Sequence, residues 1–357
     1  MPDAGIVVAD DVIDSEKAGA AMKVDGGIPA TGIGEIAEAA RRLEEVGYDG
    51  GLSAEMSHDP FLPLVIAAEH TETLELGTGI AVAFARNPMT LANLGYDLQV
   101  FSKGRFRLGL GSQIKPHIEK RFSMPWSHPA ARMRELILAM RAIWTCWNDG
   151  TPLDFRGEFY RHTLMTPFFV PGPNPFGDPR IQLAAVGKRM TEVAGEVADG
   201  VILHAFTTRR YVEEVTLPAL QRGFEHSGRT RGDFEISGPL FIVSGTDEEE
   251  FVKARAGTKQ QIAFYGSTPA YRGVLELHGW GDLQTELNRL SKQGEWVAMG
   301  ELITDDILEE FAVVAEPEAV PAAMLGRYGG IVDRLSFYAS YESDPERWKQ
   351  VLAGFKA

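Results

Sequence analysis

Alternating strand and helix patterns constrain the fold of this chain more than any other feature. Eight short runs rich in β-branched and aromatic residues cover 23–28, 48–54, 74–84, 105–110, 180–186, 200–204, 234–243 and 333–338. Stretches with helical periodicity separate them, an order that is typical of βα units around a parallel sheet. Because eight such units close a barrel, we predict an α/β protein with a (β/α)8 TIM barrel.

Two helices can be predicted from the spacing of apolar residues. Apolar side chains recur every three or four residues from Ile33 to Leu43, and Gly47 can end this helix in the left-handed conformation open to glycine. The same spacing over 133–147 predicts the longest helix. The single cysteine, Cys146, lies on that helix, and we expect it to be inert packing.

Three long stretches, 111–129, 153–179 and 265–315, interrupt the alternation. Long connections that follow strands build the active face of such a barrel, so we expect the chemistry at insertions after strands 4 and 7. No internal repeat or low-complexity linker divides the chain, which predicts one domain over 22–357. We interpret 1–21, which lacks aromatic residues, as an N-terminal extension that need not be ordered.

Composition excludes several classes of protein. The 35 Lys and Arg against 50 Asp and Glu give a net charge of −15, which disfavours binding to nucleic acid. No run of about 18 apolar residues and no signal or transit peptide can be read, so we expect no membrane span and a cytoplasmic protein. One cysteine, no HExxH motif and no carboxylate triad predict that no catalytic metal is bound. We therefore expect a small-molecule substrate.

Three segments that follow one another in order carry a resemblance to a known family. They are 74–82 with 86–88, then 104–112, and then 183–190 leading into 194–201. They resemble the third strand, the fourth strand and the phosphate-binding turn of the bacterial-luciferase-like flavin and deazaflavin enzymes. The resemblance extends from about residue 22 to the C-terminus.

Within this family the chain most resembles the branch that uses coenzyme F420, a 5-deazaflavin. The stretches 278–280, 311–313 and 332–334 are similar to oxidoreductases of that branch. The resemblance implies hydride transfer between C5 of coenzyme F420 and a small organic substrate, such as an alcohol, imine or activated alkene, in at least a homodimer. Two alternatives stay open: an FMN-dependent monooxygenase, and a protein that binds flavin or deazaflavin without catalysis.

The turn Gly187-Lys188-Arg189 is a candidate phosphate site on physical grounds alone. Free backbone N–H groups, a helix dipole and two cations converge there between an apolar strand and a helix. The alternative is an ordinary strand-to-helix turn with solvated basic residues. The resemblance implies that this turn, Gly187 to Met190, holds the cofactor phosphate.

Glycines inside the third strand point to a close approach by another group. Gly77 and Gly79 weaken a strand, and interior glycine often marks a bulge or a bound ligand. The alternative is close packing on neighbouring strands. In deazaflavin relatives a non-proline cis peptide bond here contacts the middle ring of the cofactor, so the resemblance implies a cis Gly79–Ile80 bond and makes Ser112 of the fourth-strand segment a further cofactor contact.

Proton-transfer candidates follow the strands, where hydride chemistry on an alcohol needs a base. Glu55 and His58 follow the second strand and His117 follows the fourth; Glu119 and His204 are further candidates. Each of them alone is more often a structural group.

The chain departs from the family at two of these positions. Sugar-phosphate dehydrogenases of the deazaflavin branch have Asp-His where this chain has Glu55-Met56, and a glutamate where it has Ile114. Glucose-6-phosphate oxidation is therefore in doubt, and either His58 or His117 could replace the missing histidine.

Aromatic residues gather in the predicted insertions and allow two interpretations. They are Phe122, Trp126, Phe155, Phe159, Phe168, Phe169, Tyr265 and Trp280. They could form an apolar pocket over the barrel mouth for a flat cofactor and a hydrophobic substrate, or small cores of the insertions themselves. His278, beside Trp280, could line the pocket or the cofactor tail.

Overall fold

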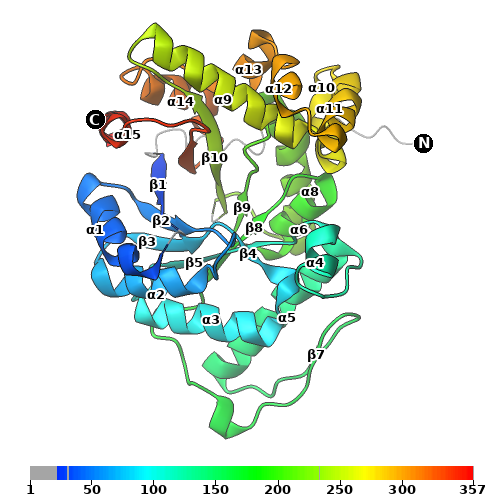
Figure 1. Cartoon of the computed structure of the whole chain (residues 1–357). Coiled ribbons are helices and arrows are strands. Elements are labelled where there is room, and N and C mark those ends of the chain that lie inside the picture. Colours follow the sequence, from blue (N-terminus) through cyan, green and yellow to red (C-terminus); the bar gives the residue numbers. More distant parts are fainter. Residues whose placement is uncertain (1–21, 30–31, 233, 357) are drawn as a thin grey trace.

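Eight parallel strands form a closed barrel in the computed structural model, which describes residues 22–29, 32–232 and 234–356 (Figure 1). The predicted extension 1–21 lies outside these ranges. The barrel strands are β1 (Lys23–Gly27), β2 (Gly50–Ser53), β3 (Glu75–Thr78), β5 (Phe106–Gly111), β8 (Arg180–Ala184), β9 (Gly200–Ile202), β10 (Glu235–Val243) and β12 (Arg334–Tyr338). Their order is β10-β12-β1-β2-β3-β5-β8-β9, and β9 pairs with β10 again. The predicted (β/α)8 TIM barrel is confirmed.

Helices connect these strands and surround the barrel (Figure 1). The main ones are α1 (Ile36–Val46), α2 (Phe61–His70), α3 (Pro88–Phe101), α5 (Pro129–Asp149), α6 (Lys188–Val197), α8 (Leu217–Ser227), α9 (Glu248–Gly266), α14 (Val320–Tyr328) and α15 (Pro345–Lys356). As predicted, α1 ends at Gly47, which has φ 99° and donates its N–H to the carbonyl of Leu43 at 3.2 Å. Helix α5 is the longest in the described ranges, and Cys146 is buried on it. None of the described helices is both long and apolar enough to cross a bilayer.

The predicted third strand is divided into two pieces. β3 ends at Thr78, the bond Gly79–Ile80 is cis, and a short strand β4 (Ala81–Val82) follows. Gly79 N donates to Ser53 O at 2.8 Å, whereas β4 pairs with β5. The segment therefore crosses from β2 toward β5, and the expectation of a cis bond at this position is confirmed.

The first insertion is more regular than the sequence predicted. The stretch 111–129, expected to be a loop, contains the short helix α4 (Lys115–Lys120), because Pro116 suits the first turn of a helix. After α5 the chain forms the hairpin β6 (Phe155–Arg156) and β7 (Arg161–His162), which extends away from the barrel (Figure 1). Phe168 and Phe169 beyond it are 90% and 68% exposed, so these two do not form a pocket.

The second insertion forms a helical layer beside the carboxyl end of β10 (Figure 1). It contains α10 (Arg272–Leu277), α11 (Gly281–Gln293), α12 (Trp296–Glu301), α13 (Asp305–Phe311) and the strand β11 (Ala312–Val314). β11 was not predicted; it pairs with the last three residues of β10. A second hydrophobic core, separate from that around the barrel, fixes this layer, with Phe206, Phe241 and Phe311 buried in it.

Candidate functional site

Buried ion pairs fill the lower half of the barrel, near the amino ends of the strands. Asp25 accepts hydrogen bonds from Arg107 Nη2 at 2.9 Å and from Arg334 Nη1 at 2.5 Å, and its side chain is 2% exposed. Glu75 and Glu235 pair with the same two arginines. Burial alone would lower the pKa of Arg334, but the three carboxylates outweigh it and the pKa is raised. This half of the barrel is therefore a charged floor, and Asp25, Arg107 and Arg334 border the bottom of the cavity above it.

Above this floor the barrel contains a cavity whose lining includes both small and large side chains. Ala54 and Gly79 line a cavity of about 480 Å³ that extends from Asp25 to Tyr338 at the carboxyl end of β12. Ile202 lines the same cavity from β9. This end of the barrel, which we call the mouth, is where TIM barrels carry their chemistry.

Glycines of β5 permit the cis segment to lie close. A Cβ atom at Gly109 would lie 1.9 Å from Thr78 O, and one at Gly111 would lie 2.9 Å from the Ile80 side chain. Thr78 Oγ1 also donates to Gly109 O at 2.6 Å. The strand glycines thus serve close packing, and Gly79 also borders the cavity.

Glu55 anchors the same segment from the side of β2. Its Oε2 accepts from Val82 N at 2.7 Å and from Arg86 Nη1 at 2.6 Å, and its side chain is 6% exposed. Its backbone N–H donates to Ile80 O at 3.1 Å. The carboxylate predicted to transfer protons is therefore occupied by an ion pair and a backbone hydrogen bond.

The two histidines predicted to act with Glu55 are both exposed on the rim. His58 lies in the loop after β2, and His117 lies on α4 after β5. Arg121 donates to the backbone carbonyl of Met56, so the two loops are in contact. The structure thus places His58 and His117 on neighbouring loops, while neither side chain makes a hydrogen bond to a described residue.

The predicted phosphate turn ends β8 and begins α6. Gly187 is the N-cap, no side chain from the described residues caps the helix, and a Cβ at Gly187 would meet nothing within 4 Å. Lys188 and Arg189 are exposed, whereas Met190 is half-buried against the main core. Free N–H groups, the helix dipole and two cations therefore face open space, an arrangement that fits a phosphate.

The wall opposite the cis segment is aromatic. His204, two residues beyond Ile202, lies with its ring centroid 4.6 Å from Tyr265 and 4.7 Å from Tyr271. Tyr265 and Tyr338 share a hydrogen bond of 2.7 Å between their hydroxyl oxygens. Burial lowers the pKa of His204 to about 4. The sequence pointed to His204 and Tyr265 separately, but it gave no sign that Tyr271 and Tyr338 would join them.

Two further predicted residues serve local structure. His278 Nε2 lies 2.8 Å from Thr208 Oγ1, and its ring stacks on Trp280 at 4.6 Å, so it ties the second insertion to the loop after β9. Ser112, half-buried at the mouth, donates through Oγ to Gln113 O at 3.1 Å. Among the described residues, no group of three His, Cys, Asp or Glu side chains is placed to hold a metal.

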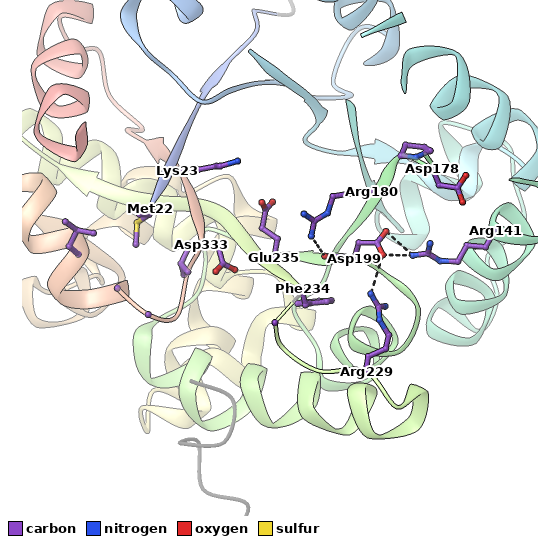
Figure 2. A pocket seen from close by; sticks show the side chains of 16 residues that line it. Met22, Lys23, Arg141, Asp178, Arg180, Asp199, Arg229, Phe234, Glu235 and Asp333 are labelled. Atoms are coloured by element: carbon purple, nitrogen blue, oxygen red, sulfur yellow. Dashed lines mark hydrogen bonds and ion pairs between the residues drawn. The ribbon is translucent and has the colours of Figure 1, made fainter. Parts of the chain in front are cut away.

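A larger cavity, about 880 Å³, lies at the other end of the barrel (Figure 2). It is lined by residues that precede or begin strands, including Lys23, Arg180 and Glu235. Figure 2 shows Arg141 and Arg229 both directed at Asp199, at 2.9 and 3.3 Å. Its positive and negative side chains largely neutralise one another, and the amino end of a TIM barrel serves stability. The larger volume of this cavity is therefore no reason to place the active site here rather than at the mouth.

Comparison with known proteins shows the family to which this chain belongs. The family model described as luciferase-like monooxygenase matches residues 18–334. An uncharacterized protein of Mycobacterium tuberculosis is 59% identical over 314 residues, which cover 88% of this chain and 92% of that protein. A putative coenzyme F420-dependent oxidoreductase of the same organism is 27% identical over 305 residues, covering 81% and 86%.

A solved structure has the same fold over nearly the whole length. It is the coenzyme F420 dependent tetrahydromethanopterin reductase from Methanopyrus kandleri, with a TM-score of 0.75, 20% identity, and coverage of 94% of this chain and 97% of that one. At this identity the likeness shows the fold alone. The match to the family model and the 59% identical relative carry the assignment: the chain belongs to the luciferase-like monooxygenase family of enzymes.

Proposed function

We propose that this protein is a coenzyme F420-dependent oxidoreductase that transfers hydride between C5 of the deazaflavin and a carbon of a small organic substrate. Two observations carry the proposal: the mouth cavity, which Gly79 of the cis Gly79–Ile80 segment lines, and the uncapped amino end of α6, which follows β8. Relatives named for coenzyme F420 support this cofactor.

The residues of the mouth fit such a cofactor in two places. Lys188, Arg189 and the first N–H groups of α6 would hold its phosphate. Gly79, which lines the mouth cavity, and the half-buried Ile80 and Ser112 would border its ring. When bound, the deazaflavin supplies a ring carbon that gives or accepts a hydride; the chain orients the substrate and handles the accompanying proton.

Glu55, His58 and His117 remain our candidates for proton transfer on the β2 side of the mouth. The imidazoles of His58 and His117 are exposed, so both are accessible to solvent and to a ligand at the rim. Glu55 would first have to part from Arg86, which makes it a positioning residue in the observed arrangement. Replacing each residue while measuring both cofactor binding and turnover separates these roles. Binding retained with turnover lost supports a role in catalysis.

An FMN-dependent monooxygenase is the second candidate, favoured by the description of the matching family model. The phosphate turn described above would serve FMN equally well. Oxygen chemistry separates the two functions, because a deazaflavin has carbon where the flavin ring has the nitrogen that assists the reaction with oxygen.

Anaerobic titration of the cofactor-free protein with coenzyme F420, and separately with FMN, tests the proposal. We expect saturable binding of coenzyme F420 at least about tenfold tighter than FMN, a difference of ~1.4 kcal/mol. The reverse order would favour the monooxygenase, and binding of neither would overturn both. Binding of coenzyme F420 without turnover of any alcohol, ketone, imine or activated alkene would favour a carrier.

A further inference from the structure

We infer that His204, Tyr265 and Tyr338 form the binding site for the oxygen atom of a neutral, apolar carbonyl substrate or of the corresponding alcohol. This inference rests on the proposed function, because it concerns the substrate that faces the cofactor. It assigns the polar contact of the substrate to the wall formed by β9, β10 and β12 rather than to the loop after β2.

The position of this wall follows from the order of the strands. β10 lies four strands from β3 in either direction around the barrel, so it is diametrically opposite the cis segment. Tyr338, at the end of β12, lines the mouth cavity together with Gly79. A flat ring that rests against Gly79 and Ile80 therefore presents its other face to this wall.

The hydrogen bond received by His204 fixes the form of its ring. Nδ1 accepts from Phe206 N at 3.0 Å, so in the neutral ring the proton is carried by Nε2. Protonation of Nδ1 would break this bond, and burial disfavours the charge as well, which agrees with the lowered pKa. His204 is thus a neutral hydrogen-bond donor rather than a base at neutral pH.

The Nε2 atom of His204 is available to a ligand. It makes no hydrogen bond to a residue of the described ranges, and it is not among their enclosed unsatisfied atoms. Tyr265, Tyr271 and Tyr338 around it are each only partly buried. Tyr338 lines the mouth cavity, its hydroxyl is bonded to that of Tyr265, and the Tyr265 ring lies 4.6 Å from the ring of His204, so the inferred oxygen site lies at the edge of the cavity beside Tyr338.

The surroundings define the chemical class of the substrate. The side chains in ring contact with this group are Phe206, Phe241, Phe264, Tyr265, Tyr271 and Tyr338, and no charged side chain of the described part pairs with His204. A carboxylate or phosphate placed here would lose its hydration without gaining a cation. An aryl or branched apolar ketone, in contrast, buries its ring and keeps one hydrogen-bonded oxygen.

The same groups can supply the proton that the carbonyl oxygen takes up when the substrate is reduced. A hydride supplied by reduced deazaflavin would form the new C–H bond at the carbonyl carbon, the electron pair of the C=O π bond would move to oxygen, and the deazaflavin would be left oxidised. Tyr338 would donate its proton to that oxygen, which as an alkoxide is the stronger base, and would regain a proton from solvent. Burial raises the pKa of Tyr338, so the hydroxyl is protonated at neutral pH.

Binding to the protein saturated with oxidised coenzyme F420 tests the site, because a ketone cannot react with the oxidised cofactor. The probes are acetophenone and its anionic counterpart benzoylformate, measured by calorimetry. We expect acetophenone to bind at least about tenfold tighter. Tyr338→Phe and His204→Leu should each weaken acetophenone about fivefold or more, and His204→Gln should weaken it less because it keeps an N–H donor.

Matched substitutions away from the mouth control for general damage. Tyr328→Phe removes a hydroxyl in the main core, and His226→Leu removes an exposed imidazole on α8; both should leave the affinity for acetophenone within about twofold. Affinity for coenzyme F420 should be unchanged in all variants. In single turnovers with the reduced cofactor, Tyr338→Phe should slow ketone reduction about 100-fold.

The inference is overturned if benzoylformate binds as well as acetophenone, if neither probe binds, or if the substitutions at His204 and Tyr338 leave affinity unchanged. Failure of coenzyme F420 to saturate the protein would instead count against the proposed function. In that case the two probes are compared on the cofactor-free protein, where the wall opposite Gly79 is still present and the same order of affinities is expected.

Discussion

Glu55 and Arg86 form an ion pair of 2.6 Å that is almost enclosed, with side-chain exposures of 6% and 14%. The pair lies next to the cis segment, since Glu55 also accepts from Val82 N and donates its own N–H to Ile80 O. It therefore holds the backbone from Ile80 to Val82, directly after the place where we propose that the cofactor ring rests.

Removing the Glu55 carboxylate should destabilise the protein strongly. Glu55→Ala leaves the Arg86 guanidinium poorly compensated, and breaking a buried pair costs about 3–5 kcal/mol. Asp59 is the matched control, because it pairs with the same arginine at 2.9 Å but is 41% exposed. We expect Asp59→Asn to cost about 0–1 kcal/mol in urea unfolding. Equal losses for the two variants would contradict the role given to Glu55.

Adding one methyl group to β5 should disturb the packing of the cis segment. In Gly109→Ala the new Cβ would lie 1.9 Å from Thr78 O, so the backbone must move, at a cost of about 1–3 kcal/mol or more. Gly326 on α14 has nothing within 4 Å of an added Cβ. Gly326→Ala should therefore be neutral or stabilise by about 0.5–1 kcal/mol. Thermal unfolding of both variants measures the difference.

The basic residues of the phosphate turn should govern cofactor affinity. Replacing Lys188 and Arg189 together with alanine should weaken coenzyme F420 about 10- to 100-fold, because two exposed cations beside the amino end of α6 are lost. The loss should shrink as salt is added. Lys292→Ala on α11, also exposed, is the control. An unchanged dissociation constant for coenzyme F420 in the double variant would show that this turn does not bind the cofactor phosphate.

The stability of the protein should rise with pH between about 4 and the ordinary pKa of histidine. Burial lowers the pKa of His204 to about 4, so in this interval the unfolded state binds a proton that the folded state does not. As pH falls through the interval, this contribution to the free energy of unfolding is lost. His204→Gln should flatten the dependence, leaving the smaller effects of His162 and His278, whose pKa values are also lowered by burial.

Denaturant unfolding of His204→Gln at several pH values, beside an exposed-site control in His226→Gln, makes this comparison. The control should keep the full pH dependence of the natural protein. A slope that is the same in both variants would show that His204 ionises normally in the folded state.

The barrel could be predicted from sequence because its signal is periodic. All eight predicted strand runs overlap a barrel strand, and the end of α1 at Gly47 follows from local backbone chemistry. Strand β11 escaped prediction because three residues after a helix carry no periodic pattern of their own. The division of the third strand depends on contacts with β2 and β5, although its glycines pointed to an irregularity.

The site was less predictable because its contacts join distant parts of the chain. Glu55 was correctly placed after the second strand, yet nothing local indicates that Arg86 occupies its carboxylate. His204 and Tyr338 are brought together only when β9 and β12 take their places on either side of β10. A tyrosine at a strand end has no motif, so only the closed barrel reveals that it meets Tyr265.

The charged floor built on Asp25 closes the barrel near the amino ends of its strands, so a ligand enters the cavity above the floor through the mouth. Arg107 and Arg334 are fixed across its width, so nothing the size of a substrate passes along the axis. Whatever reaches the mouth must leave on the side where it entered. A ligand bound deeper in the barrel is therefore released only after the ligand above it has left. The shape of the barrel thus sets the order of release before any chemistry takes place.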